Sequence, residues 1–144
     1  MDAYFDSAII LKLYVREANS QDAVTLVGAQ SAPYLLTPWQ EIEVKTAMRL
    51  KAFREEITAT ELETSLDAFE EDIRSGRWQV PAYDQARVWE STRELSARYA
   101  AKSGCRTLDL IHMATALAIR AKVFVTFDAR QKQVARLEGL SVKP

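Results

Sequence analysis

Four acidic side chains stand where a folded chain would bring them inward. Asp6 and Asp128 each directly follow a short apolar run, Asp109 precedes a long apolar segment, and Glu43 lies among apolar residues at helical spacing. Carboxylates that are forced together repel one another unless a cation neutralises them. Their hard oxygen atoms suit Mg²⁺ or Mn²⁺ better than Zn²⁺. A carboxylate-bound Mg²⁺ that keeps its waters is equipped to hydrolyse a phosphodiester, because it activates the attacking water and polarises the phosphoryl group.

Helical geometry distinguishes Glu43 from its neighbour Glu41. Successive helical residues turn by about 100°, so a helix over 39–51 would place positions 39, 42, 43, 46, 47 and 50 on one apolar, core-facing stripe. Glu41 points the other way, toward Lys45 and Arg49, where surface pairing explains it. A carboxylate on a core-facing stripe is costly unless a cation or hydrogen bonds compensate it. A buried ion pair with an arginine is the competing interpretation of Glu43.

The three aspartates also have a simpler, structural interpretation. Aspartate is a favoured N-cap residue, and capping alone would explain Asp6 and Asp128 after their strands. Capping would explain Asp109 as well, although Thr107 is a second candidate for the cap of the same helix. Residue type alone therefore leaves both interpretations open for these positions.

Short apolar runs alternate with helical patterns along the chain, which predicts a parallel sheet with helices on its faces. Ligands of such sheets bind beyond the carboxyl ends of the strands, so Asp6 and Asp128 are expected at one edge if their strands are neighbours. The predicted strands are 3–5, 33–36, 78–80, 123–127 and 140–142, the last of them at the edge of the sheet. The predicted helices are 9–14, 20–29 with Ser20 as N-cap, one that begins at Thr37-Pro38, one with a capping box at Thr58 and Glu61 or at Thr60 and Glu63, 83–102, 110–121 and 129–137.

Length and composition predict one ordinary domain in a reducing compartment. The 144 residues are 48% hydrophobic and 27% charged, which predicts a single folded domain over 1–144. Cys105 is the only cysteine, so no internal disulfide can form. No apolar run approaches the roughly 18–20 residues of a membrane span, and the first residues do not read as a signal peptide. We therefore expect a cytoplasmic protein that does not enter a membrane.

Charge and the remaining reactive residues favour no other chemistry. The formal net charge of −1 gives no general attraction to nucleic acid, so local cations would have to hold an RNA. His112, the only histidine, lies on a buried-looking helix and is interpreted as a structural hydrogen-bonding residue. Cys105 is interpreted as a packing residue. No glycine-rich phosphate loop is present.

Four sequence blocks together resemble a known family. They are YFDSA at 4–8, TPWQEIEVKTA at 37–47, RTLDLIHMATA at 106–116 and FVTFD at 124–128, and their order and spacing are similar to those of PIN domains. Within that family, the blocks resemble the VapC-type toxins of bacterial and archaeal toxin–antitoxin pairs. The resemblance covers nearly the whole chain.

The resemblance implies an α/β, PIN-like three-layer fold with a central parallel sheet flanked by helices. It implies a metal-dependent endoribonuclease that uses Mg²⁺, with Mn²⁺ as a substitute. Ser7 and Thr126 match small hydroxyl positions that would orient a carboxylate or a water. Some members carry a further acid after the last one, whereas Ala129 and Arg130 follow here, so the resemblance leaves open whether one or two ions bind. The acids that match the family's site are Asp6, Glu43, Asp109 and Asp128.

The resemblance also implies partners. It implies an RNA substrate, a homodimer and an antitoxin protein that covers or enters the acidic cleft. Arg106 and Arg130 lie beside the acids in sequence and are candidates for phosphate contacts, although a solvated surface role explains them equally well. Two other interpretations stay open: a PIN nuclease of RNA processing or DNA transactions without an antitoxin, and a catalytically inert PIN module that binds a partner.

Overall fold

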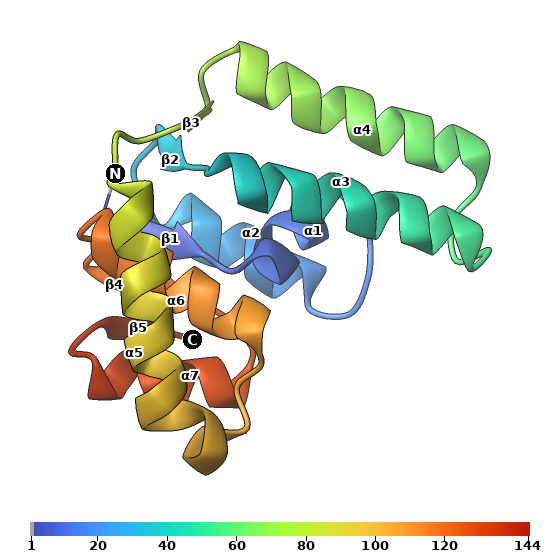
Figure 1. Ribbon diagram of the computed structural model, residues 1–144. Helices are drawn as coiled ribbons and strands as arrows, with labels where there is room; N and C mark the ends of the chain where they lie inside the picture. The colour runs from blue at the N-terminus through green and yellow to red at the C-terminus, as the bar shows by residue number, and fades with distance from the viewer. Residues whose placement is uncertain (1) are drawn as a thin grey trace. The chain divides into compact units, whose positions relative to one another are not determined.

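The computed structural model describes residues 2–144 and has the α/β class that the sequence predicts (Figure 1). By its contacts the chain forms two compact units. The first unit is Ser7–Val80, and the second unit joins the short segment Asp2–Asp6 to Pro81–Pro144. Within the described residues, none of the helices combines the length and the apolar character that crossing a lipid bilayer requires.

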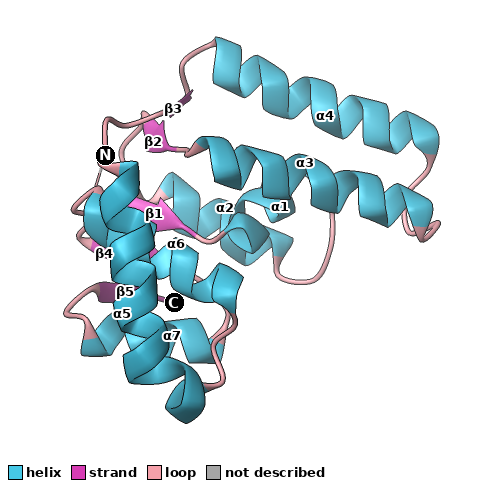
Figure 2. Cartoon of the chain, in the orientation of Figure 1, coloured by secondary structure: helices cyan, strands magenta, loops and turns pink. Residues whose placement is uncertain are grey.

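The second unit contains a three-stranded parallel sheet in the order β1-β4-β5 (Figure 2). The strands are β1 (Ala3–Phe5), β4 (Val123–Val125) and β5 (Ser141–Lys143). Phe5 of β1 is paired with Val125 of β4, so the two strands end side by side. The strands before Asp6 and Asp128 are therefore parallel neighbours, which is the condition under which the sequence places both acids at one edge. The last strand lies at the edge of the sheet, as predicted. β4 is shorter than predicted and ends at Val125, although the backbone N–H of Thr126 still donates a hydrogen bond to the carbonyl of Lys143 in β5.

Three helices complete the second unit: α5 (Gln85–Ser103), α6 (Thr107–Ala118) and α7 (Ala129–Leu137). α5 begins at its N-cap Asp84 and ends at Gly104, whose φ of +72° is the left-handed conformation that favours glycine at a helix end. α7 has the predicted bounds. α6 begins three residues earlier than predicted, because the Asp109 side chain accepts a hydrogen bond from the backbone N–H of Arg106 and closes the first turn. Thr107 is thus the first helical residue and not the cap.

The aromatic side chains of β1 and β4 anchor the sheet beneath these helices. Tyr4 and Phe124 are fully buried, and their rings stack with centroids 5.5 Å apart. Most of the α6 side chains are buried too, as its apolar sequence predicts. Stacked aromatic pairs of this kind contribute about 0.5–1.5 kcal/mol beyond the area they bury. The packing holds the carboxyl ends of both strands in a fixed place.

The first unit is mainly helical. Its two short strands pair in parallel, Tyr34 with Trp78, as a separate two-stranded sheet and not as part of one continuous sheet. Thr37 caps α3, and Thr58 forms the predicted capping box with Glu61 at the start of α4. α3 and α4 lie side by side (Figure 1). The elements are α1 (Ser7–Tyr14), α2 (Ser20–Gly28), β2 (Tyr34–Leu35), α3 (Pro38–Phe53), α4 (Ala59–Arg74) and β3 (Trp78–Gln79).

The face that α3 buries is not the predicted one. The buried residues of the helix are Gln40, Val44 and Met48, whereas Ile42 is 65% and Leu50 is 43% exposed. The prediction ranked positions by apolar side chain alone and missed the capping box. In that box the Gln40 side chain turns inward, and its Oε1 accepts hydrogen bonds from the backbone N–H and the hydroxyl of the N-cap threonine. The buried stripe therefore begins at Gln40.

The start of α2 also differs from the prediction. Asn19, with φ of +65°, is the N-cap, and Ser20 is already the first helical residue. The Ser20 hydroxyl accepts a hydrogen bond from the backbone N–H of Glu17 and donates one to the carbonyl of Val15. It therefore stabilises the turn before the helix instead of the helix end, since serine competes effectively for nearby backbone groups.

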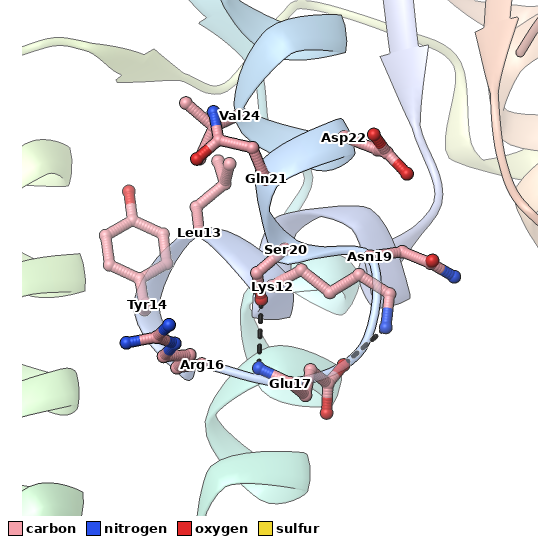
Figure 3. Close-up of a pocket in the computed structure, with 10 residues that line it drawn as sticks. All are labelled: Lys12, Leu13, Tyr14, Arg16, Glu17, Asn19, Ser20, Gln21, Asp22 and Val24. Carbon is pink, nitrogen blue, oxygen red and sulfur yellow. Dashed lines mark hydrogen bonds and ion pairs between the residues drawn. The ribbon is translucent and has the colours of Figure 1, made fainter.

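Glu17 joins two helices of the first unit through lysines. Its Oε1 lies 2.7 Å from Lys12 Nζ of α1, and its Oε2 lies 2.8 Å from Lys51 Nζ of α3. Figure 3 shows Glu17 and Lys12 in the open pocket beside α1 and α2. Burial acts to raise the pKa of Glu17, but the hydrogen bonds from Lys12 and Lys51 outweigh it and lower the pKa below its ordinary 4.5.

This lowered pKa predicts a pH-dependent contribution to stability. A carboxyl whose pKa is lower in the folded state stabilises the protein above its unfolded pKa and loses that contribution as the pH falls through the folded pKa. Glu17→Gln should therefore reduce the urea midpoint near about pH 7, and the gap to the wild type should close as the pH falls below 4.5. Urea unfolding curves of the wild type and of Glu17→Gln, recorded at pH values between these limits, measure the difference in midpoint. A gap that is equally wide at every pH would contradict the prediction.

Candidate functional site

Asp6 and Thr126 lie where the neighbouring strands β1 and β4 end. The backbone N–H of Asp6 donates to the carbonyl of Val125 over 3.0 Å, which extends the ladder by one step. The buried Thr126 hydroxyl donates to Asp6 Oδ2 at 3.4 Å and accepts a hydrogen bond from the backbone N–H of Asp128 at 3.0 Å. One threonine thus connects the two acids that follow the strands.

Asp128 caps α7, as the structural interpretation of this residue predicts. Its Oδ1 accepts hydrogen bonds from the backbone N–H groups of Arg130 at 2.8 Å and Gln131 at 2.9 Å. Among the described residues, both hydrogen bonds that this carboxylate accepts end on Oδ1. The cap therefore occupies one carboxylate oxygen, and capping does not exclude a second role for the other.

Asp109 lies in the first turn of α6 and is held on both oxygens. Its Oδ2 accepts from the backbone N–H of Arg106, and its Oδ1 accepts from the side-chain Nε2 of Gln131, each over 2.9 Å. Gln131 belongs to α7, so this bond joins the N-terminal turns of α6 and α7. Sequence reasoning missed Gln131. Its signal was its position three residues after the N-cap Asp128, in the turn that the cap closes.

His112 lies beside Asp6 in the second unit. Its Nδ1 is 2.8 Å from the hydroxyl of Tyr4, and its Nε2 is 3.6 Å from Asp6 Oδ1. His112 is 2% exposed, and its ring meets the Tyr4 ring edge-on at 5.8 Å. The predicted structural hydrogen bond is confirmed. The proximity of the ring to a candidate acid was not predicted.

The Cys105 thiol lies in the turn between α5 and α6, where the charges of two candidate acids act on it. Burial raises the pKa of the Cys105 thiol; a hydrogen bond with Ser103 acts to lower it, while the charges of Asp109 and Asp128 raise it further. Two carboxylates thus act on the same thiol. The raised pKa keeps Cys105 in its poorly nucleophilic thiol form, which agrees with its interpretation as a packing residue.

Glu43 is held by a serine of the first unit. Ser7 Oγ donates to Glu43 Oε2 over 2.7 Å, and Ser7 directly follows Asp6 in the sequence. Glu41 instead pairs with Lys45 at 2.7 Å, as predicted for a surface residue. That hydrogen bond raises the pKa of Lys45. The two glutamates therefore have different environments, although the stripe from which this was predicted is wrong.

The two arginines proposed to contact RNA are exposed in the structure. Arg130 Nη1 donates to the carbonyl of Gly104 at 3.1 Å, which ties the start of α7 to the end of α5. Arg106 is exposed at the start of α6. Phosphate contacts of both side chains stay predictions.

The oxygen atoms offered by the acids of the second unit are of the chemical type that binds a hard divalent ion. Asp6, Asp109 and Asp128 offer only carboxylate oxygens, the ligands that Mg²⁺ and Mn²⁺ prefer. Gln131 adds a buried acceptor, because its Oε1 has no hydrogen-bond donor among the described residues. Over residues 2–144, however, no group of three or more histidine, cysteine, aspartate or glutamate side chains is close enough to hold one ion. The four-acid site therefore stays a prediction.

Comparison with known proteins identifies the family. The sequence model of the PIN domain family matches residues 3–137, which include every strand and helix from β1 to α7. A search among curated proteins gives no match. The matched region contains the whole of Ser7–Val80, most of the second unit and all four predicted acids. Because the family model covers nearly the whole chain, this protein belongs to the PIN domain family.

Proposed function

We propose that this protein is a Mg²⁺-dependent endoribonuclease. PIN domains are generally nucleases that act on RNA and use divalent metals. The observation that carries the proposal is that Asp6 and Asp128 follow two neighbouring parallel strands of one unit, in a chain matched by the PIN model, while Gln131 joins Asp109 to the start of α7. Parallel sheets bind ligands at this edge.

In this proposal the acids hold the metal and their neighbours orient them. Asp6, Asp109 and Asp128 act from the second unit, with Thr126 fixing Asp6 through its hydroxyl. Glu43 is the fourth acid because it matches the acidic site of the family that the sequence resembles, and within the first unit its Oε2 accepts a hydrogen bond from Ser7. A divalent ion bound by carboxylates lowers the pKa of a water and neutralises charge on a phosphoryl group. No residue of the chain needs to act as a covalent nucleophile.

The exposed arginines supply the cations that a chain of net charge −1 needs near its RNA. Arg106 and Arg130 are exposed at the starts of α6 and α7, the helices that carry Asp109 and follow Asp128. Guanidinium groups bind phosphate oxygens through paired N–H donors. We propose that both contact the phosphates that flank the cleaved bond.

We further propose that the protein is the toxin of a type II toxin–antitoxin pair and acts in the cytoplasm as a homodimer. The toxin assignment and the antitoxin partner rest on the resemblance of the four blocks to VapC-type toxins. The proposed homodimer would cover large apolar side chains of α3 that are exposed in the single chain: Ile42, Leu50 and Phe53 are 65%, 43% and 83% exposed. Sedimentation of the purified chain tests this assembly.

The proposed activity is tested with purified protein and a mixed RNA substrate. The wild type should cleave RNA in Mg²⁺ or Mn²⁺, stop when a chelator removes the ion, and resume when the ion is restored. Asp6→Asn should remain folded, because asparagine has nearly the same shape as aspartate. Its rate of RNA cleavage should fall at least about 100-fold, because asparagine lacks the negative charge proposed to bind the metal. Circular dichroism of the variant is the control for folding.

Other outcomes would identify the alternatives. A wild type that cuts no RNA in either ion, like Asp6→Asn, would support an inert PIN module that binds a partner. Cleavage without growth arrest on induced expression would support a PIN nuclease that works without an antitoxin. Growth arrest by the wild type, with normal growth of Asp6→Asn, would support the toxin.

A further inference from the structure

One glutamine joins two of the proposed metal ligands. The backbone N–H of Gln131 donates to Asp128 Oδ1, and its side-chain Nε2 donates to Asp109 Oδ1, each over 2.9 Å. Gln131 is only 3% exposed, whereas Gln133, two residues further along α7, is exposed. Burying a polar side chain is costly unless its position serves its hydrogen bonds. Gln131 is therefore held inward by the acids.

The side-chain oxygen of Gln131, Oε1, accepts no hydrogen bond from the described residues. An ionised carboxylate only accepts hydrogen bonds, so the end of the amide that faces Asp109 must be Nε2, which fixes Oε1 on the other side. Oε1 is buried, and no donor of residues 2–144 reaches it. A buried acceptor without a donor calls for a specific explanation, such as an ion or a water. The waters of a hydrated divalent cation are donors of the required kind.

We propose that Gln131 is a positioning residue of the metal site, which holds Asp109 against Asp128 and offers Oε1 to a water of the bound ion. The inference rests on the proposed metal-dependent function. The two N–H donors compensate two negative charges before any cation arrives, so less rearrangement is needed when it binds. Groups that orient metal ligands affect affinity in this way without touching the metal.

The test compares Gln131→Met with Gln133→Met. Methionine keeps the length of the side chain and removes the amide, and the exposed Gln133 on the same helix is the matched control. We measure Mn²⁺ affinity by electron paramagnetic resonance of the free ion, and the thermal midpoint of the chelator-treated protein. Gln131→Met should weaken Mn²⁺ binding by about 10- to 100-fold. Its chelator-treated midpoint should change little, because the loss of the hydrogen bond to Asp109 and the removal of a buried acceptor without a donor act in opposite directions.

Each result decides between the inference and the function on which it rests. Weaker Mn²⁺ binding in Gln131→Met alone, with an unchanged or higher midpoint, supports the positioning role. Equal Mn²⁺ affinity in the wild type and Gln131→Met overturns that role and leaves the nuclease proposal standing. A lower midpoint with unchanged affinity shows a merely structural glutamine and also overturns it. A wild type that binds no Mn²⁺ overturns the proposed metal site and this inference together.

A second measurement needs only the wild type and covers the case in which Gln131→Met does not fold. The side-chain amide signals of Gln131 and Gln133 are followed by nuclear magnetic resonance while Mg²⁺ is added. The Gln131 signal should move with the ion concentration, and the Gln133 signal should stay in place. A Gln131 signal that is unmoved at saturating Mg²⁺ overturns the inference.

Discussion

Replacing Asp128 with serine is expected to abolish RNA cleavage and to leave the fold intact. Asp128 has two separable roles here: its Oδ1 caps α7, and its carboxylate is proposed to bind the metal. Serine is about as good an N-cap as aspartate, so the stability should change by less than about 0.5 kcal/mol. Serine has no charge for the ion, so cleavage should fall by at least about 100-fold. Urea unfolding and a cleavage assay in Mg²⁺ measure the two effects.

Asp128→Ala is the matched control for this separation. Alanine removes both the cap and the charge, so it should lose the same activity and also about 1 kcal/mol of stability. An Asp128→Ser protein that cuts RNA at the wild-type rate would show that this residue only caps α7. An Asp128→Ser protein as destabilised as Asp128→Ala would instead show that the serine fails to replace the cap.

Glu43→Gln is expected to lose at least about 100-fold in cleavage rate, while Glu41→Gln keeps the wild-type rate within about twofold. The amide of glutamine still accepts the hydrogen bond that Ser7 donates to Glu43, so the local structure should persist. The negative charge is lost, and with it the proposed contribution to the metal site. Glu41 pairs with Lys45 on the surface, and such pairs contribute little.

Comparing the two variants distinguishes the effect of the charge at position 43 from the effect of the total charge of α3. Both change one glutamate of α3 to glutamine, and both alter the net charge equally. Cleavage rates at saturating RNA, with circular dichroism as a check of the fold, provide the measurement. Equal activity in the two variants would remove Glu43 from the proposed site. Equal loss in both would point to the charge of α3 as a whole.

Local patterns predicted the elements well because their causes are local. The N-cap at Thr37, the capping box at Thr58, the glycine end of α5 and the bounds of α7 follow from side chains within a few residues of one another. The parallel sheet was predicted from apolar runs that alternate with helical patterns, whereas the pairing of β1 with β4 entered only as a condition and was found in the structure. The buried face of α3 was predicted wrongly. The side chain of Gln40 turns inward to bond the N-cap residue, so the helix buries the face of Gln40 and not the apolar stripe.

The sequence by itself determined the family, the class of fold and the order of the acids, because hydrophobic period, caps and spaced motifs are properties of neighbouring residues. Only the tertiary structure decided how the acids are held. Thr126 connects Asp6 to Asp128 across two strands, and Gln131 connects Asp109 to Asp128 across two helices. The two partners of Gln131, Asp109 and Asp128, are 19 residues apart in the printed sequence. A hydrogen bond between distant segments depends on packing that no local pattern encodes.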